Sequence, residues 1–147
     1  MKTLKEEEKV LLLDKGILTK YHEYMKTNKD SLLSKYMGVF TIKISHMADI
    51  TCIIMDNLLG KDVASIERIY DLKGSTKGRI VPLKDSLPTG LKVLKDLNFV
   101  SLEERLKVTR KEKERVLRII ESDARFLSNN NLMDYSLLFI KAKRAVN

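Results

Sequence analysis

One stretch, from Ile69 to Arg79, constrains the fold most, because an apolar run there ends in a Lys-Gly-Ser turn and continues with basic residues. Alternation along a strand places Asp71 and Lys73 on the same face. Gly74 allows backbone angles that a side chain would block. The turn also supplies hydrogen-bond donors and cations suited to a phosphate, namely Ser75, Thr76, Lys73, Lys77 and Arg79.

This pattern leaves two interpretations open. In the first, the end of the strand contacts a phosphate. In the second, the segment is an edge hairpin with a solvated basic turn, and Asp71 and Lys73 form a surface ion pair of little energetic weight. The choice between them depends on a second segment further along the chain.

The second segment, Leu132 to Ile140, predicts a buried strand entered from an asparagine turn at 129–131. It contains one acid, and alternation places Asp134 and Ser136 on the same face. A carboxylate inside an apolar strand is costly unless a charged or hydrogen-bonding group meets it. A structural aspartate satisfied by backbone amides or a lysine is one interpretation, and a functional carboxylate is the other.

Together the two segments resemble the two signature motifs of the phosphatidylinositol phosphate kinases. The matching residues are Asp71-Leu72-Lys73-Gly74-Ser75 and Met133-Asp134-Tyr135-Ser136-Leu137-Leu138. Shorter segments of the chain also resemble landmarks of that family. These segments are Met1-Lys2-Thr3-Leu4, Tyr36-Met37-Gly38-Val39-Phe40, Met55-Asp56-Asn57-Leu58-Leu59, Leu87-Pro88-Thr89 and Lys95-Asp96-Leu97-Asn98-Phe99. The resemblance therefore runs from Lys2 to about Leu138, nearly the whole chain.

The resemblance implies catalytic roles for three residues. Asp134 would orient the inositol hydroxyl or take its proton, and Lys73 would neutralise the transferring γ-phosphate of ATP. Asp71 would orient Lys73. The protein contributes little covalent chemistry to phosphoryl transfer. We therefore expect these side chains to position the reactants and to neutralise charge.

Nucleotide and phosphate contacts are implied for a further set of residues. Lys2 would reach the α- and β-phosphates and pair with Glu7 in the helix that follows. Gly74 and Ser75 would contact the nucleotide as well. The residues implied for a phosphate of the lipid head group or the nucleotide are Arg79 and Lys77.

The resemblance also implies parts that residues 1–147 do not contain. A kinase of this kind has a glycine-rich loop before the lysine strand, and a metal-binding aspartate and an activation loop after the Asp134 strand. We therefore expect a partial kinase domain over 1–147 that uses ATP and Mg²⁺ but holds no metal ligand of its own.

The hydrophobic pattern predicts helices over 5–27 and 102–128, separated by strands and a loop-rich stretch. The strands are expected at 35–45, 49–58 and 66–73, in an antiparallel meander, and the loop-rich stretch at 76–100. With the resemblance, this predicts an α+β fold, a protein-kinase-like lipid kinase core in which a twisted antiparallel sheet packs against two long helices.

Composition limits the classes of partner that the chain is expected to bind. The 147 residues suffice for one modest domain, and the net charge of +8 favours approach to an anionic surface. Aromatic residues are only 6% of the chain and do not alternate with basic runs, which disfavours nucleic acid. The apolar runs are too short to span a bilayer. We expect a cytoplasmic protein that is peripheral at the inner face of the plasma membrane or at an internal membrane.

These observations predict ATP-dependent phosphotransfer to the inositol ring of a phosphatidylinositol phosphate, with weak or no activity from residues 1–147 alone. The first alternative is a non-catalytic kinase-like module that binds anionic lipid or a protein partner. Nucleic-acid binding through the +8 charge is the second alternative.

Overall fold

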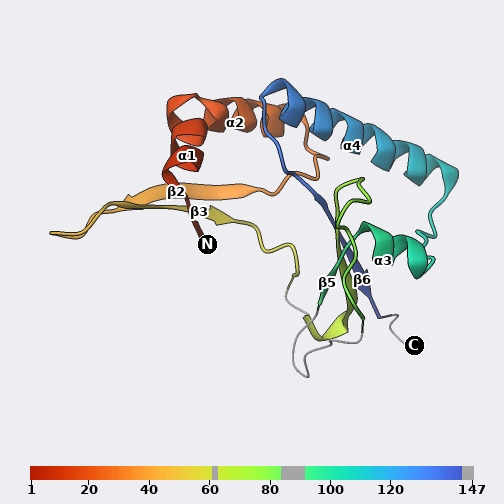
Figure 1. The fold of residues 1–147 in the computed structure, drawn as a ribbon. Coiled ribbons are helices and arrows are strands. Elements are labelled where there is room, and N and C mark those ends of the chain that lie inside the picture. Colours follow the sequence, from red (N-terminus) through yellow and green to blue (C-terminus); the bar gives the residue numbers. More distant parts are fainter. Residues whose placement is uncertain (61–62, 84–91, 144–147) are drawn as a thin grey trace. The chain divides into compact units, whose positions relative to one another are not determined.

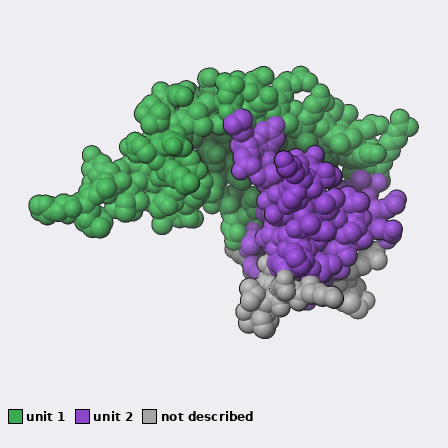
Figure 2. All heavy atoms as spheres, in the orientation of Figure 1, with its two compact units in different colours: residues 1–58, 109–132 green, residues 59–108, 133–147 purple. Residues whose placement is uncertain are grey.

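The computed structural model describes residues 1–60, 63–83 and 92–143, which form two compact units (Figure 2). Unit 1 comprises Met1–Leu58 and Thr109–Leu132, and unit 2 comprises Leu59–Val108 and Met133–Asn147. Each unit contains its own three-stranded sheet. The predicted landmark Leu87-Pro88-Thr89 lies outside the described residues.

Unit 1 combines a sheet with helical segments from both of its chain stretches (Figure 1). The sheet has the order β1-β3-β2, and both strand pairs are antiparallel. Its elements are β1 (Lys2–Thr3), α1 (Glu6–Lys9), the π-helix η1 (Val10–Asp14), α2 (Ile17–Thr27), β2 (Tyr36–Ile42), β3 (Ile50–Met55) and α4 (Arg110–Asn129).

The predicted helix over 5–27 is broken into α1, η1 and α2. Gly16, between η1 and α2, has φ +70°, in the left-handed region that disfavours residues with a Cβ atom. The second predicted helix, over 102–128, begins only at Arg110, where Thr109 and Glu112 form a capping box. The prediction of two long helices is therefore not confirmed.

The core of unit 1 lies where the first helical segments meet the sheet. Leu12, Ile17 and Ile53 form its buried cluster. An α-helical periodicity over 5–27 predicts Leu13 on the same apolar face as Val10 and Ile17, but Leu13 is exposed and Leu12 is buried. The extra residue per turn of the π-helix explains this shift, because it rotates the side chains relative to an α-helical register.

Unit 2 contains a sheet of order β5-β4-β6. Its elements are the 3₁₀-helix η2 (Val63–Ser65), β4 (Ile66–Leu72), β5 (Val93–Leu94), α3 (Asp96–Ser101) and β6 (Leu137–Ala142). The β4–β6 pair is antiparallel, and the β4–β5 pair is parallel. The predicted meander is confirmed for β2 and β3, which pair antiparallel, and is wrong for β4, which pairs with β6 from the far end of the chain and not with β3. The mixed α/β character is confirmed, but the single antiparallel sheet is replaced by two small sheets.

The core of unit 2 forms around Tyr70 in the central strand. The Tyr70 ring is fully buried and lies 5.2 Å from the ring of Phe99 in α3 and 6.0 Å from that of Phe139 in β6, measured between centroids. These aromatic contacts hold α3 and β6 on the central strand.

The predicted strand over 132–140 is shorter in the structure. Asn131 and Asp134 have φ of +55° and +61°, which are left-handed values that no strand residue adopts. The strand β6 therefore begins at Leu137, and Asp134 lies in the bend that precedes it. Among the described residues, no helix combines the length and apolar character needed to cross a bilayer.

Candidate active site

The antiparallel pairing of β4 and β6 brings the two predicted motifs together. Leu72 at the end of β4 pairs with Leu137 at the start of β6. The turn after β4 and the bend before β6 consequently lie at the same edge of the sheet. Lys73 follows Leu72 directly, and Asp134 precedes Leu137 by three residues.

Lys73 and Asp134 form an ion pair at this edge. The Lys73 ammonium donates a hydrogen bond to Oδ1 of Asp134. The side chain of Asp134 is 86% exposed and that of Lys73 is 27% exposed. The hydrogen bond and charge of Lys73 lower the pKa of Asp134 below its ordinary value. The predicted burial of Asp134 is wrong, because its backbone turns out of the strand, but its predicted lysine partner is present.

The turn after β4 is held by a carboxylate that the sequence analysis did not assign to the site. Oδ1 of Asp96 accepts hydrogen bonds from the backbone N–H groups of Lys73 at 3.0 Å and Gly74 at 2.8 Å. Gly74 has φ +68°, which lets consecutive N–H groups converge on one oxygen. The backbone N–H groups of Lys73 and Gly74 are thus bonded within the protein.

Arg79 joins the same group of side chains. Its Nε donates to Oδ2 of Asp96 at 2.8 Å, and its Nη2 donates to Oδ1 of Asp71 at 3.2 Å and to the Asp71 carbonyl oxygen. The predicted orientation of Lys73 by Asp71 is therefore corrected. Asp71 pairs with Arg79, because the turn returns the chain and places the guanidinium beside the end of β4.

The electrostatics of Asp96 follow from these contacts. Burial acts to raise the pKa of Asp96, but the hydrogen bonds from Arg79 and the backbone amides outweigh burial and lower the pKa to about 2. The pKa of Arg79 is raised, chiefly by the hydrogen bond to Asp96. Both side chains remain charged at neutral pH.

Two further predicted residues of the turn are exposed. Ser75 and Lys77 lie on the surface between Gly74 and Arg79. Their positions leave their side chains accessible to a ligand at this edge of the sheet, whereas Arg79 is only 11% exposed.

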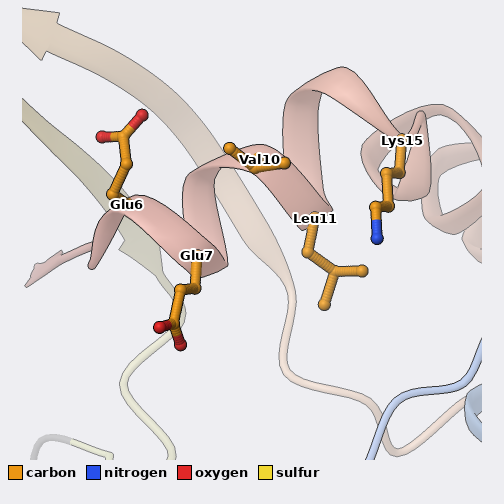
Figure 3. Close-up of a pocket in the computed structure, with 5 residues that line it drawn as sticks. All are labelled: Glu6, Glu7, Val10, Leu11 and Lys15. Carbon is orange, nitrogen blue, oxygen red and sulfur yellow. The ribbon is translucent and has the colours of Figure 1, made fainter.

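The lysine and glutamate predicted for the nucleotide lie in unit 1. The Lys2 ammonium donates to Oε1 of Glu8 at 2.6 Å. Glu7, which was predicted as the partner, instead projects toward a shallow hollow beside α1 and η1, together with Leu11 and Lys15 (Figure 3). The Lys2 hydrogen bond, and then that from the Lys5 N–H, lower the pKa of Glu8. The predicted Lys–Glu pair exists, but one residue further along the chain.

Two hollows lie in the described part of unit 1, and neither is lined by Lys73 or Asp134. The first, of about 410 Å³, is the one beside α1. The second, of about 430 Å³, lies in unit 1 between the end of α2 and the middle of α4. The candidate site lies at an exposed edge of the sheet, because the Asp134 side chain is 86% exposed.

The residues present do not fit a metal ion. Within 1–60, 63–83 and 92–143, no three histidine, cysteine, aspartate or glutamate side chains are grouped as metal ligands. Of the acids near Lys73, Asp71 and Asp96 are engaged by Arg79, and Asp134 is engaged by Lys73 itself. We therefore derive no step through Mg²⁺.

Sequence reasoning missed two buried carboxylates besides Asp96. Glu104 accepts hydrogen bonds from Arg68 at 2.6 Å, from Tyr70 at 2.9 Å and from Lys141 at 3.0 Å. Burial is the largest cause that raises the pKa of Tyr70 to about 12, followed by the hydrogen bond to Glu104. The sequence around Glu104, in a polar loop, did not indicate these contacts, because the partners of Glu104 are more than thirty residues away in the chain.

The other missed carboxylate is Asp123 in unit 1. It is buried in α4 and accepts hydrogen bonds from the hydroxyl of Tyr24 at 2.8 Å, the hydroxyl of Ser31 at 2.7 Å and the N–H of Leu32 at 2.7 Å. Its position on the apolar stripe between Ile120 and Leu127 was the available signal. Asp123 connects α4 to the end of α2 and the loop that follows.

Comparison with known proteins gives the class of this chain. A model of the family described as phosphatidylinositol-4-phosphate 5-kinase matches residues 1–145. Because the match covers nearly all of the chain, the chain belongs to this family of lipid kinases. The family resemblance stated from the two motifs is thereby confirmed.

Individual relatives agree with the family. The chain is 38% identical over 132 residues to a Plasmodium falciparum phosphatidylinositol 4-phosphate 5-kinase, covering 86% of this chain and 8% of that protein. It is 37% identical over 139 residues to phosphatidylinositol 4-phosphate 5-kinase 9 of Arabidopsis thaliana, with coverages of 94% and 16%. A phosphatidylinositol 5-phosphate 4-kinase type-2 gamma of Danio rerio is 32% identical over 124 residues, with coverages of 84% and 29%. The chain thus spans less than a third of each of these relatives.

Proposed function

We propose that this chain supplies part of the active site of a kinase that transfers the γ-phosphoryl group of ATP to a ring hydroxyl of a phosphatidylinositol monophosphate. The observation that carries the proposal is the Lys73–Asp134 pair, which brings the two family motifs to one edge of a sheet. The substrate class follows from the names of the relatives, which include both 4-phosphate and 5-phosphate kinases.

The proposed step assigns one role to each member of the pair. A ring hydroxyl oxygen forms a bond to the γ-phosphorus while the bond from that phosphorus to the bridging oxygen of ATP breaks. The hydroxyl proton goes to the Asp134 carboxylate, and the displaced electron pair leaves with ADP. Lys73 neutralises the charge on the transferring group, which is the main contribution that a protein makes to phosphoryl transfer.

The acidity of Asp134 suits orientation more than early deprotonation. Its pKa is lowered by Lys73, so the carboxylate is ionised at neutral pH and accepts a hydrogen bond from the hydroxyl. Phosphoryl transfer passes through a loose transition state, in which the nucleophile needs little prior activation. Proton transfer to Asp134 then accompanies the later part of bond formation.

The remaining predicted residues keep supporting roles in this proposal. Ser75 and Lys77 are exposed beside Lys73, and we assign them contacts with phosphate. Gly74 shapes the turn, because its N–H is already bonded to Asp96. Independently, we propose that Lys2, fixed by Glu8, contacts a nucleotide phosphate. Arg79, with two carboxylate partners, supports the turn more readily than it contacts substrate.

We further propose that the protein acts as a peripheral protein on an anionic membrane, because its lipid substrate is found there. The net charge of +8 supports this placement. The same charge supports one other function, a non-catalytic module that binds anionic lipid without using ATP. Nucleotide binding separates these two candidates.

The test is the melting temperature of the chain with and without ATP and Mg²⁺. A ligand that binds the folded state raises the melting temperature, and we expect a rise that grows with ATP concentration. Lys73→Met should weaken this binding about 10-fold or more, because a charge-assisted contact is lost. Lys20→Met, at an exposed lysine of α2, is the matched control and should leave the rise unchanged.

Two outcomes would contradict the proposal. The absence of any ATP-dependent rise, together with binding to anionic vesicles, would favour the non-catalytic module. An equal loss in Lys73→Met and Lys20→Met would show that only net charge matters. Because the chain spans less than a third of its relatives, we expect little or no lipid phosphorylation by residues 1–147 alone.

A further inference from the structure

Asp96 makes three hydrogen bonds that we call the Asp96 bridge. Oδ1 accepts from the N–H groups of Lys73 and Gly74, and Oδ2 accepts from Nε of Arg79. The Asp96 side chain is 13% exposed, so these contacts form in a largely water-excluded place. Both of its oxygens are therefore occupied by donors from the turn that follows β4.

The bridge is closed on its other side by the main chain. The N–H of Leu97 donates to the carbonyl oxygen of Arg79 at 2.9 Å, and the Asp71 carbonyl oxygen accepts from the Arg79 guanidinium. The end of β4, the turn and the start of α3 are thus linked in a ring of contacts. A backbone held at so many points has little freedom to change the direction of its side chains.

The Lys73–Asp134 pair itself lies outside this ring, and its Asp134 side chain is 86% exposed. An exposed ion pair contributes little to fixing its own geometry, because solvent screens it and two side chains must be ordered. The direction of the Lys73 side chain therefore depends on the backbone from which it projects. That backbone is held at its N–H by Asp96.

We infer that Asp96 is a positioning residue, which fixes the peptide units of Lys73 and Gly74 so that the Lys73 ammonium is directed toward Asp134. The inference rests on the proposed function for the importance of that pair, but it concerns a residue for which no role was predicted. Asp96 contacts neither the Lys73 ammonium nor Asp134, so it acts through the backbone of the turn.

The chemistry of the bridge requires a carboxylate. An asparagine at 96 would present one oxygen to the two amides, but its NH₂ group would face the Nε–H of Arg79, donor against donor. An alanine would leave two backbone N–H groups and one guanidinium N–H without this acceptor. The bridge also means that the Lys73 and Gly74 amides are not open to a phosphate, because they are already bonded to Asp96.

The test uses the full chain and the carboxyl resonance of Asp134 in an NMR pH titration. In the unaltered protein Asp134 should titrate below an ordinary aspartate, because Lys73 is directed at it. Asp96→Asn should move this titration upward toward that of an exposed aspartate, by about the same amount as Lys73→Met. Glu67→Gln is the matched control, since it removes a carboxylate of unit 2 that does not touch the turn, and it should leave the titration in place.

An unchanged Asp134 titration in folded Asp96→Asn would overturn the inference, because a purely structural role would not move it. A second measurement does not depend on how well that variant folds. In the unaltered protein the N–H groups of Lys73 and Gly74 should exchange with solvent about 10-fold or more slowly than that of exposed Ser75. Equal exchange at the three positions would also overturn the inference.

These results are separable from the test of function. A titration that responds to Asp96→Asn in a chain that binds no ATP would uphold the positioning role and contradict the kinase proposal. If ATP binding requires Lys73 but the Asp134 titration is the same in Asp96→Asn, the kinase proposal is upheld and the positioning role of Asp96 is contradicted.

Discussion

The ammonium of Lys73 donates a hydrogen bond to the carboxylate of Asp134, although the two residues are 61 positions apart in the chain. Each lies just beyond the end of a strand, and the strands pair so that Leu72 meets Leu137. The contact is therefore a consequence of antiparallel register, and a shift of that register would separate the two side chains.

The two members of this pair should respond oppositely when ATP binding is measured. Asp134→Asn removes an anion that competes with the triphosphate for Lys73, so ATP with Mg²⁺ should bind as tightly as before or more tightly. Lys73→Met removes the cation and should weaken binding about 10-fold or more. Isothermal titration of both variants against the unaltered chain measures this, and a parallel loss in both would contradict the assigned roles.

The contribution of Asp96 to stability should depend on pH in a defined window. Its pKa of about 2 in the folded state is below the value of about 4 expected in the unfolded chain. Its stabilisation is therefore present above pH 4 and is lost as the pH falls toward 2. Chemical denaturation of Asp96→Asn at neutral pH should show a loss of about 1–2 kcal/mol, after a discount for solvent screening.

The difference in unfolding free energy between Asp96→Asn and the unaltered chain should shrink as the pH is lowered from 4 to 2. The control is Asp14→Asn, which removes an exposed carboxylate of unit 1 and so measures the effect of losing one negative charge alone. A difference that stays constant over this window would mean that the carboxylate charge is not what stabilises the turn.

Removal of Asp123 should destabilise unit 1. Asp123→Ala leaves the hydroxyls of Tyr24 and Ser31 and the N–H of Leu32 without their acceptor, at a cost of about 2–3 kcal/mol. Glu121→Ala, on the same helix, breaks only an exposed pair with Arg125 and should cost less than about 1 kcal/mol. Urea denaturation compares the two, and equal losses would show that the hydrogen bonds of Asp123 do not account for its effect on stability.

Two glycines of unit 1 should respond with opposite signs to alanine. Gly16 has φ +70°, so Gly16→Ala should cost about 1 kcal/mol from backbone strain although nothing crowds the new Cβ atom. Gly38, in β2, lies outside the left-handed region and also has open space, so Gly38→Ala should be neutral or stabilising. Melting temperatures measure both, and a stabilising Gly16→Ala would contradict the break between η1 and α2.

The strands were the most predictable part of the fold. The predicted ranges 35–45, 49–58 and 66–73 contain β2, β3 and β4, because each segment has local apolar character and bordering turn residues. Their pairing was not predictable in the same way. The partner of β4 is β6, and hydrophobic alternation does not indicate which distant strand a given strand joins.

Helix bounds were less well predicted, for reasons that differ between the two ends of the chain. Thr109 and Glu112 form a capping box with a recognisable Thr-x-x-Glu spacing, so the start of α4 was legible in the sequence. The π-helix η1 had no such signature, because it depends on packing against β3. Gly16 was the one local sign that the first helix is interrupted.

The candidate site was predictable only where side chains form motifs. Lys73 and Asp134 stood out because family resemblance marked them, and the structure pairs them. Asp96 was part of a family landmark but received no role, since its function depends on backbone N–H groups whose direction is set by the conformation of Gly74. The neighbour assigned to Lys2 was wrong by one residue because the bend between β1 and α1 decides which glutamate it meets.

The left-handed backbone at Asp134, with φ +61°, restricts the amino acids that this position can hold before any chemistry is considered. Aspartate, asparagine and glycine tolerate that conformation, whereas glutamate gains no local hydrogen bond to offset it. Exchange of aspartate for glutamate, normally regarded as conservative, therefore carries a backbone cost here, although Glu103 shows that a glutamate can adopt a positive φ. The backbone conformation at position 134 thus favours aspartate over glutamate.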